Sequence, residues 1–206
     1  MYKEAITKKT QSVLDKLASS SIVKDFYLAG GTALALQFGH RESIDLDWFT
    51  EKDFDLGKLK GQLADAGNFE VVSEAPGTLH GILDGVKITF LYYNYPLLFP
   101  LIALEDTALS DERDIATMKI DAISSRGSKK DFIDLYFLLK KYTLEEIIGF
   151  FEKRYANIRY NKMHILKSLV YFEEAQNEAL PVMLQAADWE EIKKVIKEEV
   201  NRLVGI

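Results

Sequence analysis

The chain has 206 residues, of which 48 % are hydrophobic and 28 % charged, and its net charge is −6. This composition is typical of a soluble globular protein that buries a core in one domain or two small lobes. The absence of cysteine excludes disulfides and thiolate zinc sites. No apolar signal follows the first methionine, and no apolar run is long enough to cross a membrane. We therefore expect a cytoplasmic protein without membrane association.

The first predicted element is a helix within residues 2–18, where apolar residues recur at helical spacing. Its apolar stripe consists of Ala5, Val13, Leu14 and Leu17. Such a stripe packs a helix against a core, and we expect no catalytic or binding role for this helix.

The next stretch combines a short strand with a glycine-rich helix start. Residues 26–28 predict the end of a buried strand, and Gly30 and Gly31 follow it directly. Adjacent glycines let a ligand approach the backbone closely. Thr32 suits the N-cap of the following helix, whose free amides favour an anion, and Gly39 suits its C-terminal end.

Apolar and acidic residues then alternate over residues 44–49, which predicts a strand. Asp45 and Asp47 fall on one face of this strand, and the opposite face carries Ile44, Leu46 and Trp48. Carboxylates two residues apart on a strand are about 7 Å apart at their bases, close enough to bind divalent cations together. An exposed acidic strand face is the alternative, but the glycine-rich helix start upstream favours a nucleotide–metal site.

A helix over residues 55–66, a strand over 69–72 and a hairpin follow. An Asp-Gly turn at 84–85 joins hairpin strands over 78–83 and 86–93, a strong hairpin signal. A connector with two prolines over 95–104 then predicts a boundary between lobes. We expect an α+β protein with a mixed-sheet lobe over residues 1–100 and a helical lobe over residues 101–206, in which every element after the connector is a helix.

Two helices of the second lobe carry candidate site residues. Asp111 suits the N-cap of the first helix, where Lys119 and Arg126 share one side. A lysine in an apolar stripe commonly extends to the surface, which is the alternative to a role in binding. Asp131 and Asp134 share a face of the second helix, either as acids favoured by the helix dipole or as site residues.

Three further amphipathic helices are expected over residues 143–204. The segment from 113 to 167 has twelve Lys or Arg against seven Asp or Glu, which suits either a phosphate-rich substrate or ordinary solvated helix faces. Aromatic and basic residues interleave within it in a pattern that can bind single-stranded nucleic acid or form an interhelical seam, namely Tyr155, Arg159, Tyr160 and Lys162. His80 and His164 are expected to be structural.

The motif of Gly30-Gly31, a helix, and Asp45-Leu-Asp47 resembles the first motif of the DNA polymerase β-like nucleotidyltransferases. More closely, residues 29–36 and 39–47 resemble the AbiEii/AbiGii toxin family of bacterial nucleotidyltransferases. The resemblance continues through Met118-Lys119 and through Lys130-Asp131 to Tyr136. It therefore covers roughly residues 20–140 with several motifs in the same order.

The resemblance implies a polymerase β-like fold and a role for each matching residue. Asp45 and Asp47 would hold one or two Mg²⁺ ions, and Gly30, Gly31 and Thr32 would hold phosphate. Lys119 and Arg126 would contact the nucleoside triphosphate, His40 and Arg41 would assist, and Asp131 would orient the lysine or accept a proton. Thr89 departs from the superfamily, because it stands where a third carboxylate is usual and a hydroxyl is a poor metal ligand.

The implied function is transfer of a nucleoside monophosphate from a nucleoside triphosphate to a hydroxyl acceptor. For related toxins the acceptor is the 3′ end of tRNA, in a type IV system with a partner antitoxin. Two alternatives are a protein that binds nucleotide without turnover, which Thr89 favours, and an enzyme that modifies a small molecule such as an aminoglycoside.

Overall fold

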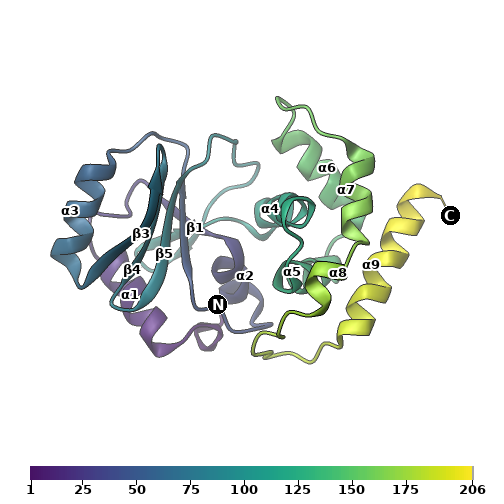
Figure 1. Ribbon diagram of the computed structural model, residues 1–206, viewed down its shortest axis with the longest axis horizontal. Helices are drawn as coiled ribbons and strands as arrows, with labels where there is room; N and C mark the ends of the chain where they lie inside the picture. Colours follow the sequence, from purple (N-terminus) through teal and green to yellow (C-terminus); the bar gives the residue numbers. More distant parts are fainter. Residues whose placement is uncertain (206) are drawn as a thin grey trace.

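The computed structural model describes residues 1–205, and a mixed seven-stranded sheet in the order β3-β4-β5-β2-β1-β7-β6 organises it (Figure 1). The strands are β1 (Tyr27–Ala29), β2 (Leu46–Thr50), β3 (Phe69–Ala75), β4 (Thr78–Leu83), β5 (Val86–Tyr92), β6 (Ile102–Leu104) and β7 (Thr107–Leu109). The first helices are the 3₁₀ helix η1 (Lys3–Ala5), α1 (Lys8–Ala18), α2 (Gly30–Phe38) and α3 (Leu56–Ala66). After the sheet come α4 (Glu112–Ser125), α5 (Lys129–Leu139), α6 (Leu144–Arg154), α7 (Lys162–Leu169), α8 (Glu173–Gln176) and α9 (Trp189–Val204).

Strand β2 lies at the centre of the sheet, antiparallel to β1 and parallel to β5. The β4–β5 hairpin turns at Asp84 and Gly85, which both have positive φ. This two-residue turn fixes the register of the hairpin, so that His80 pairs with Thr89. Because β5 also pairs with β2, Thr89 lies opposite Asp47. The turn thereby positions three polar residues in one row across the sheet.

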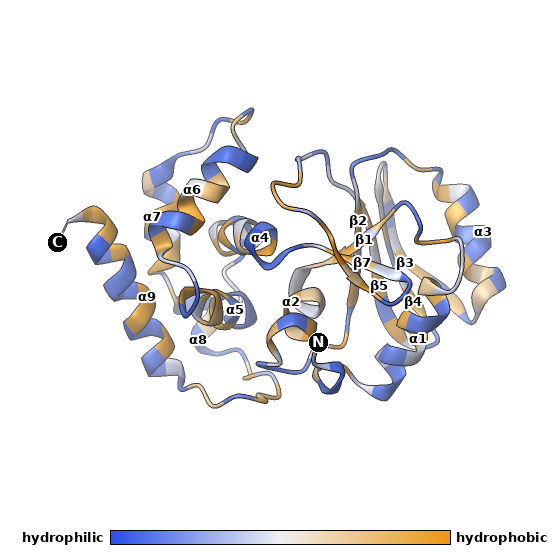
Figure 2. Cartoon of the chain, turned by 180° about the vertical axis from the view of Figure 1, so that it is seen from behind, coloured by the Kyte–Doolittle hydropathy of each residue, from blue (hydrophilic) through white to orange (hydrophobic). Residues whose placement is uncertain are grey.

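The two faces of the sheet differ in what covers them. Leu46 and Trp48 point to the face covered by α1 and α3, where Trp48 stacks on Phe90 of β5. Asp47 and Phe49 alternate with them and therefore point to the opposite face. Figures 1 and 2 show α2, α4 and α5 on this second side of the sheet, with α6 to α9 beyond them. The carboxylates thus face the boundary between sheet and helices.

The outer helices pack through one apolar side. In α9 the buried residues are Trp189, Ile192, Ile196 and Val200, spaced at three or four residues. Figure 2 shows hydrophobic and hydrophilic turns alternating along α9 in the same way. Asp188 caps the start of this helix by accepting hydrogen bonds from two backbone amides.

The structure confirms the α+β class, the hairpin with its Asp-Gly turn, and the end of α2 at Gly39 in the left-handed region. The expectation of helices alone after the proline connector is wrong, because β6 and β7 extend the sheet beside β1. Four helices rather than three occupy residues 143–204. Strand β2 begins only at Leu46, and Ile44 is exposed instead of sharing the buried face. Within residues 1–205, no helix has the length and apolar character needed to cross a membrane.

Candidate active site

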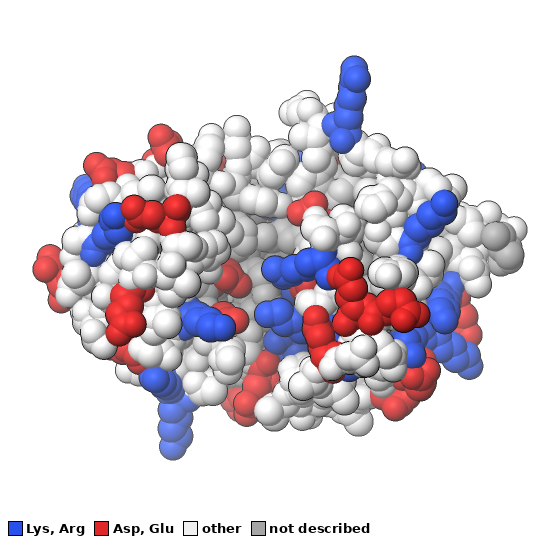
Figure 3. Space-filling model, in the orientation of Figure 1, with Lys and Arg blue, Asp and Glu red and all other residues white. Residues whose placement is uncertain are grey.

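A cavity of about 440 Å³ lies between the sheet face that carries Asp47 and helix α4. The residues that line it come from α2, the loop after it, β2, the β4–β5 hairpin, α4 and α5, and they are Gly30, Gly31, Arg41, Ser43, Asp45, Asp47, Phe49, His80, Thr89, Leu91, Tyr93, Met118, Lys119, Asp121, Ala122, Ser125, Arg126 and Lys130. Figure 3 shows the molecule hollowed in the middle of the face in view, with both basic and acidic side chains at the edge of the hollow.

Asp45 and Asp47 both line this cavity, as the spacing of two residues predicts. Burial and the neighbouring negative charge of Asp45 raise the pKa of Asp47, while contact with the Thr89 hydroxyl and the charge of Lys119 oppose the shift. Within residues 1–205 neither aspartate forms an ion pair. A buried carboxylate beside a like charge is stabilised by a cation.

Gly30 begins α2 with a φ of +64°, and a Cβ at this position would lie 3.0 Å from Oδ2 of Asp47. A Cβ at Gly31 would lie 2.4 Å from the guanidinium of Arg41. The two glycines therefore let a carboxylate and a cation from other segments approach the first turn of α2 closely. The free backbone amides of that turn add positive potential on the same side of the cavity.

Lys119 projects from α4 toward α5 and is buried, with 4 % of its surface exposed. Its ammonium lies 2.8 Å from Asp131 and 2.6 Å from Asp134, which are both fully buried. Arg41 donates two hydrogen bonds to Asp134, at 2.7 Å from Nε and 2.8 Å from Nη2. Arg126 donates to Asp131 at 3.1 Å and keeps most of its side chain exposed. Both acids thus hold cations at the cavity wall.

The electrostatics of this ion cluster follow from its burial and charge balance. Burial acts to raise the pKa of Asp131, but the charges of Lys119 and Arg126 outweigh it and lower the pKa to about 2. Burial of Asp134 is likewise outweighed by Arg41 and Lys119, which hold its pKa well below the ordinary value. Burial opposes the charge on Lys119, but the two aspartates raise its pKa. All members are therefore ionised at neutral pH.

The structure places two of the candidate site residues away from the cavity wall. Helix α2 begins at Gly30 with Ala29 as its N-cap, so Thr32 lies inside the helix. Its buried hydroxyl bonds to Ser43 and to the backbone carbonyl of Asp45, and it orders the approach to β2 without lining the cavity. His40 is fully buried, outside the cavity wall, and its Nε2 lies 2.8 Å from Asp134.

The alternative roles of Lys119 and Tyr155 are also decided by burial. Lys119 does not extend to the surface but forms ion pairs inside the protein. Tyr155 is buried, its hydroxyl bonds to that of Tyr93 and its ring packs on Tyr95, so it belongs to the contact between α6 and the segment that follows β5. A stacking surface for nucleic acid that includes Tyr155 is therefore not present at residues 155–162.

Sequence reasoning missed several residues of the cavity wall. His80 was expected to be structural, yet it lines the cavity and its Nδ1 lies 3.2 Å from the Thr89 hydroxyl. The signal was present in the sequence, because a two-residue turn at Asp84-Gly85 pairs His80 with Thr89. The wall also includes residues to which the sequence analysis gave no role, namely Phe49, Leu91, Tyr93, Met118 and the exposed Lys130.

The residues present fit a hard divalent cation at the carboxylate pair. Asp45 and Asp47 supply oxygen ligands, which Mg²⁺ prefers, and the raised pKa of Asp47 marks an unneutralised charge. Within residues 1–205 no group of three or more His, Cys, Asp or Glu side chains is arranged to hold a metal. A magnesium ion here would therefore need the oxygens of water or of a bound phosphate to complete its ligands.

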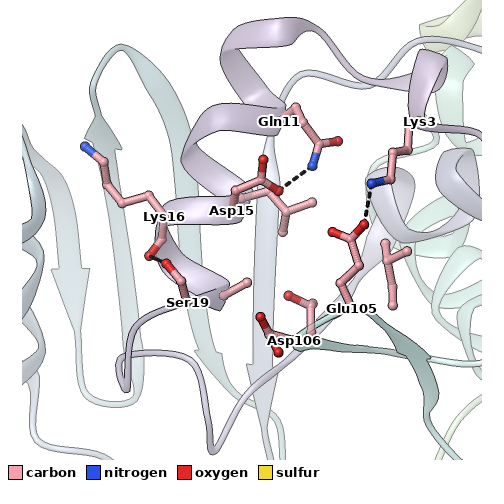
Figure 4. Close-up of a pocket in the computed structure, with 11 residues that line it drawn as sticks. Lys3, Gln11, Asp15, Lys16, Ser19, Glu105 and Asp106 are labelled. Atoms are coloured by element: carbon pink, nitrogen blue, oxygen red, sulfur yellow. Dashed lines mark hydrogen bonds and ion pairs between the residues drawn. The ribbon is translucent and has the colours of Figure 1, made fainter.

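A second pocket of about 350 Å³ lies between α1 and the β6–β7 turn, outside the ion cluster. In Figure 4 the Lys3 ammonium meets the Glu105 carboxylate and the Gln11 amide meets Asp15, while Lys16 points away from the pocket. Two pairs of its polar side chains thus bond to each other, and none of the candidate site residues lies in this pocket.

Two comparisons by sequence relate the chain to known proteins. The family model described as nucleotidyl transferase AbiEii toxin, type IV TA system, matches residues 12–107. An uncharacterized protein of Aquifex aeolicus (strain VF5) is 40 % identical over 202 residues, which cover 95 % of this chain and 96 % of the relative.

Solved structures show the same fold. MenT4, described as a nucleotidyltransferase toxin from Mycobacterium tuberculosis H37Rv, has a TM-score of 0.65 at 15 % identity, covering 96 % of this chain and 83 % of that one. A candidate nucleotidyltransferase from H. pylori has a TM-score of 0.56 at 18 % identity over 95 % of both chains. The chain thus shares the fold of these nucleotidyltransferases, and it belongs to the AbiEii nucleotidyltransferase toxin family.

Proposed function

We propose that this protein transfers a nucleoside monophosphate from a nucleoside triphosphate to a hydroxyl acceptor in a magnesium-dependent reaction. One observation carries the proposal: a single cavity combines the Asp45–Asp47 carboxylate pair, the glycine start of α2 and four cationic side chains. Phosphoryl transfer depends on positioning and on neutralising the charge of the phosphates, and these groups supply both.

The chain's own residues divide this work. Asp45 and Asp47 hold Mg²⁺, which neutralises phosphate charge when it is bound. The amides at Gly30 and Gly31 and the guanidinium of Arg41 receive phosphate oxygens at the start of α2. Lys119 and Arg126 contact the same anion from α4.

Asp131 acts as a positioning residue in this proposal. It has no exposed surface, it does not line the cavity, and its oxygens bond to Lys119, Arg126 and Ser128. A carboxylate with a pKa lowered to about 2 is a weak base at neutral pH. Its contacts instead fix the lysine, in parallel with Asp134 on the next turn of α5.

We further propose RNA, at the 3′ end of tRNA, as the acceptor, in a toxin role restrained by an antitoxin protein. The family model's description and that of MenT4 support the toxin role. The exposed Arg126 and Lys130 at the cavity wall offer contacts for an acceptor backbone. Phe49, Tyr93 and Met118 add apolar surface for a nucleobase.

Thr89 favours a second candidate, a protein that binds nucleotide without turnover, because a hydroxyl stands opposite Asp47 where the superfamily commonly has a carboxylate. Purified protein, α-labelled nucleoside triphosphates and Mg²⁺ would be incubated with total tRNA, or with aminoglycosides as small acceptors. Label on RNA with wild type and none with Asp45→Ala supports the proposal. Label on the small acceptors alone overturns the RNA assignment, and nucleotide binding without any product supports the second candidate.

A further inference from the structure

The row of polar residues across the sheet contains a histidine that the proposed reaction does not yet use. His80 on β4, Thr89 on β5 and Asp47 on β2 are consecutive partners in the strand register, and all three line the cavity. Strand neighbours are about 4.8 Å apart, so His80 lies two strands, or about 10 Å along the sheet, from Asp47.

We propose that His80 is the general base of the transfer reaction, which rests on the function proposed above. Its Nε2 takes the proton of the acceptor hydroxyl while the hydroxyl oxygen bonds to the α-phosphorus. The bond between that phosphorus and the oxygen bridging to the β-phosphate breaks, and its electron pair leaves with pyrophosphate. An imidazole can accept a proton near neutral pH, which the Thr89 hydroxyl cannot.

The hydrogen bonds of the row orient the imidazole for this task. Nδ1 of His80 lies 3.2 Å from the Thr89 hydroxyl, which in turn contacts the Asp47 carboxylate. Because a carboxylate only accepts, a Thr89 hydroxyl that donates toward Asp47, its partner in the strand register, accepts the Nδ1 proton. This chain of donors selects the tautomer whose Nε2 carries a free lone pair.

The position of His80 also suits an in-line displacement, in which the attacking and leaving oxygens lie on opposite sides of the phosphorus. On one side of Asp47 the sheet continues to β5 and β4, where His80 lies. On the other side is β1, where Ala29 pairs with Asp47 and leads into Gly30 and the start of α2. Pyrophosphate would leave toward α2, Arg41 and Lys119, while the acceptor approaches from the β4 side.

Four of the other acids near the site are already engaged. Asp131 and Asp134 have no exposed surface and are bonded to cations. Asp45 and Asp47 hold the metal in the proposed reaction. Asp121 lines the cavity from α4, on the wall opposite the sheet row. His80 alone among the three histidines lines the cavity, all three lying within residues 1–205.

The test compares His80→Gln with wild type on the acceptor that wild type labels. We expect kcat to fall about 100-fold or more, the range for loss of a general base. Affinity for the nucleoside triphosphate, measured by calorimetry with Ca²⁺ in place of Mg²⁺, should stay unchanged. His164→Gln, an exposed histidine of α7 outside the cavity, should keep wild-type kcat.

Chemical rescue separates base catalysis from a structural effect. Added imidazole should restore His80→Ala in proportion to its concentration and leave wild type unchanged. Thr89→Val removes the hydrogen bond to Nδ1 of His80 and should lower kcat about 10-fold. If the His80 variants fail to fold, this variant tests the orientation of the imidazole instead.

Three results overturn the proposal: His80→Gln within a few-fold of wild type, a parallel loss of nucleotide affinity, or no rescue by imidazole in a folded His80→Ala. A wild-type protein that labels no acceptor overturns the proposed function and this inference together. Activity in wild type with unimpaired His80→Gln overturns the inference alone.

Discussion

Asp134 is the acid on which the buried ion cluster depends, and its replacement by asparagine tests this account of the fold. The carboxylate accepts from His40 and Arg41 and lies 2.6 Å from the Lys119 ammonium, with no exposed surface. Asp134→Asn leaves Lys119 with Asp131 as its acidic partner and leaves the buried Arg41 without an ion pair among residues 1–205. Breaking a buried pair in this way costs about 3–5 kcal/mol.

Equilibrium unfolding in urea at pH 7 measures this loss. With a slope of about 2–3 kcal/mol/M for a chain of this size, the midpoint should fall by about 1–2 M. Asp65→Asn is the matched control, because Asp65 is exposed on α3 and has no ion pair among residues 1–205. The midpoint of this variant should stay close to that of wild type, with a change in the free energy of unfolding of less than about 0.5 kcal/mol.

A double-mutant cycle with Lys119→Met isolates the contact itself. Once the lysine is absent, Asp134→Asn should cost about 1–3 kcal/mol less than in wild type. An Asp134→Asn midpoint equal to that of wild type, or additive losses in the double variant, would refute the reasoning from buried charge.

Three further predictions concern stability. Gly31→Ala should lower the free energy of unfolding by about 1–3 kcal/mol, because its Cβ would clash with the buried guanidinium of Arg41. Gly61→Ala, which has open space around it in α3, should raise the free energy of unfolding by about 0.5–1 kcal/mol. Equal changes of the two variants in thermal melts would contradict this expectation. As the pH falls from about 4 to 2, Asp131 should lose about 2 kcal/mol of its contribution to stability, because its pKa is lowered to about 2 and the unfolded chain takes up the proton first. Asp134, whose pKa is held well below its ordinary value, adds to this loss, so Asp134→Asn should make the pH dependence of unfolding shallower, and an unchanged slope would contradict this. Thr143→Ala removes the capping box of α6 and should cost about 1 kcal/mol in urea unfolding, and no change would show that the cap is unimportant.

The hairpin, the glycine start of α2 and the aspartate pair were predictable because local chemistry fixes them. Asp84 and Gly85 both adopt positive φ, and that turn alone sets which residues face each other across the hairpin. The alternation over residues 44–49 placed both aspartates on one face, and they do line one cavity. Local sequence patterns therefore predict those elements whose conformation depends on residues close together in the sequence.

The rest depends on contacts between distant segments. Strands β6 and β7 have three residues each, and β7 pairs with β1, some 80 residues earlier in the sequence, while β6 pairs with β7. A local pattern could therefore not identify them. His40 is a loop residue beside the motif, and only the packing of α5 against α2 shows that Asp134 binds it. Thr32 has the chemistry of an N-cap, but tertiary contact with Ser43 directs its hydroxyl elsewhere.

The central claim is that Asp45 and Asp47 support nucleotidyl transfer, and label transfer tests it most directly. Each α-labelled nucleoside triphosphate would be incubated with total tRNA, Mg²⁺ and the protein, with Asp45→Ala and Asp65→Asn alongside. We predict label on RNA for wild type and Asp65→Asn and none for Asp45→Ala. Equal labelling by Asp45→Ala, or no labelled acceptor of any kind with wild type, would contradict the account.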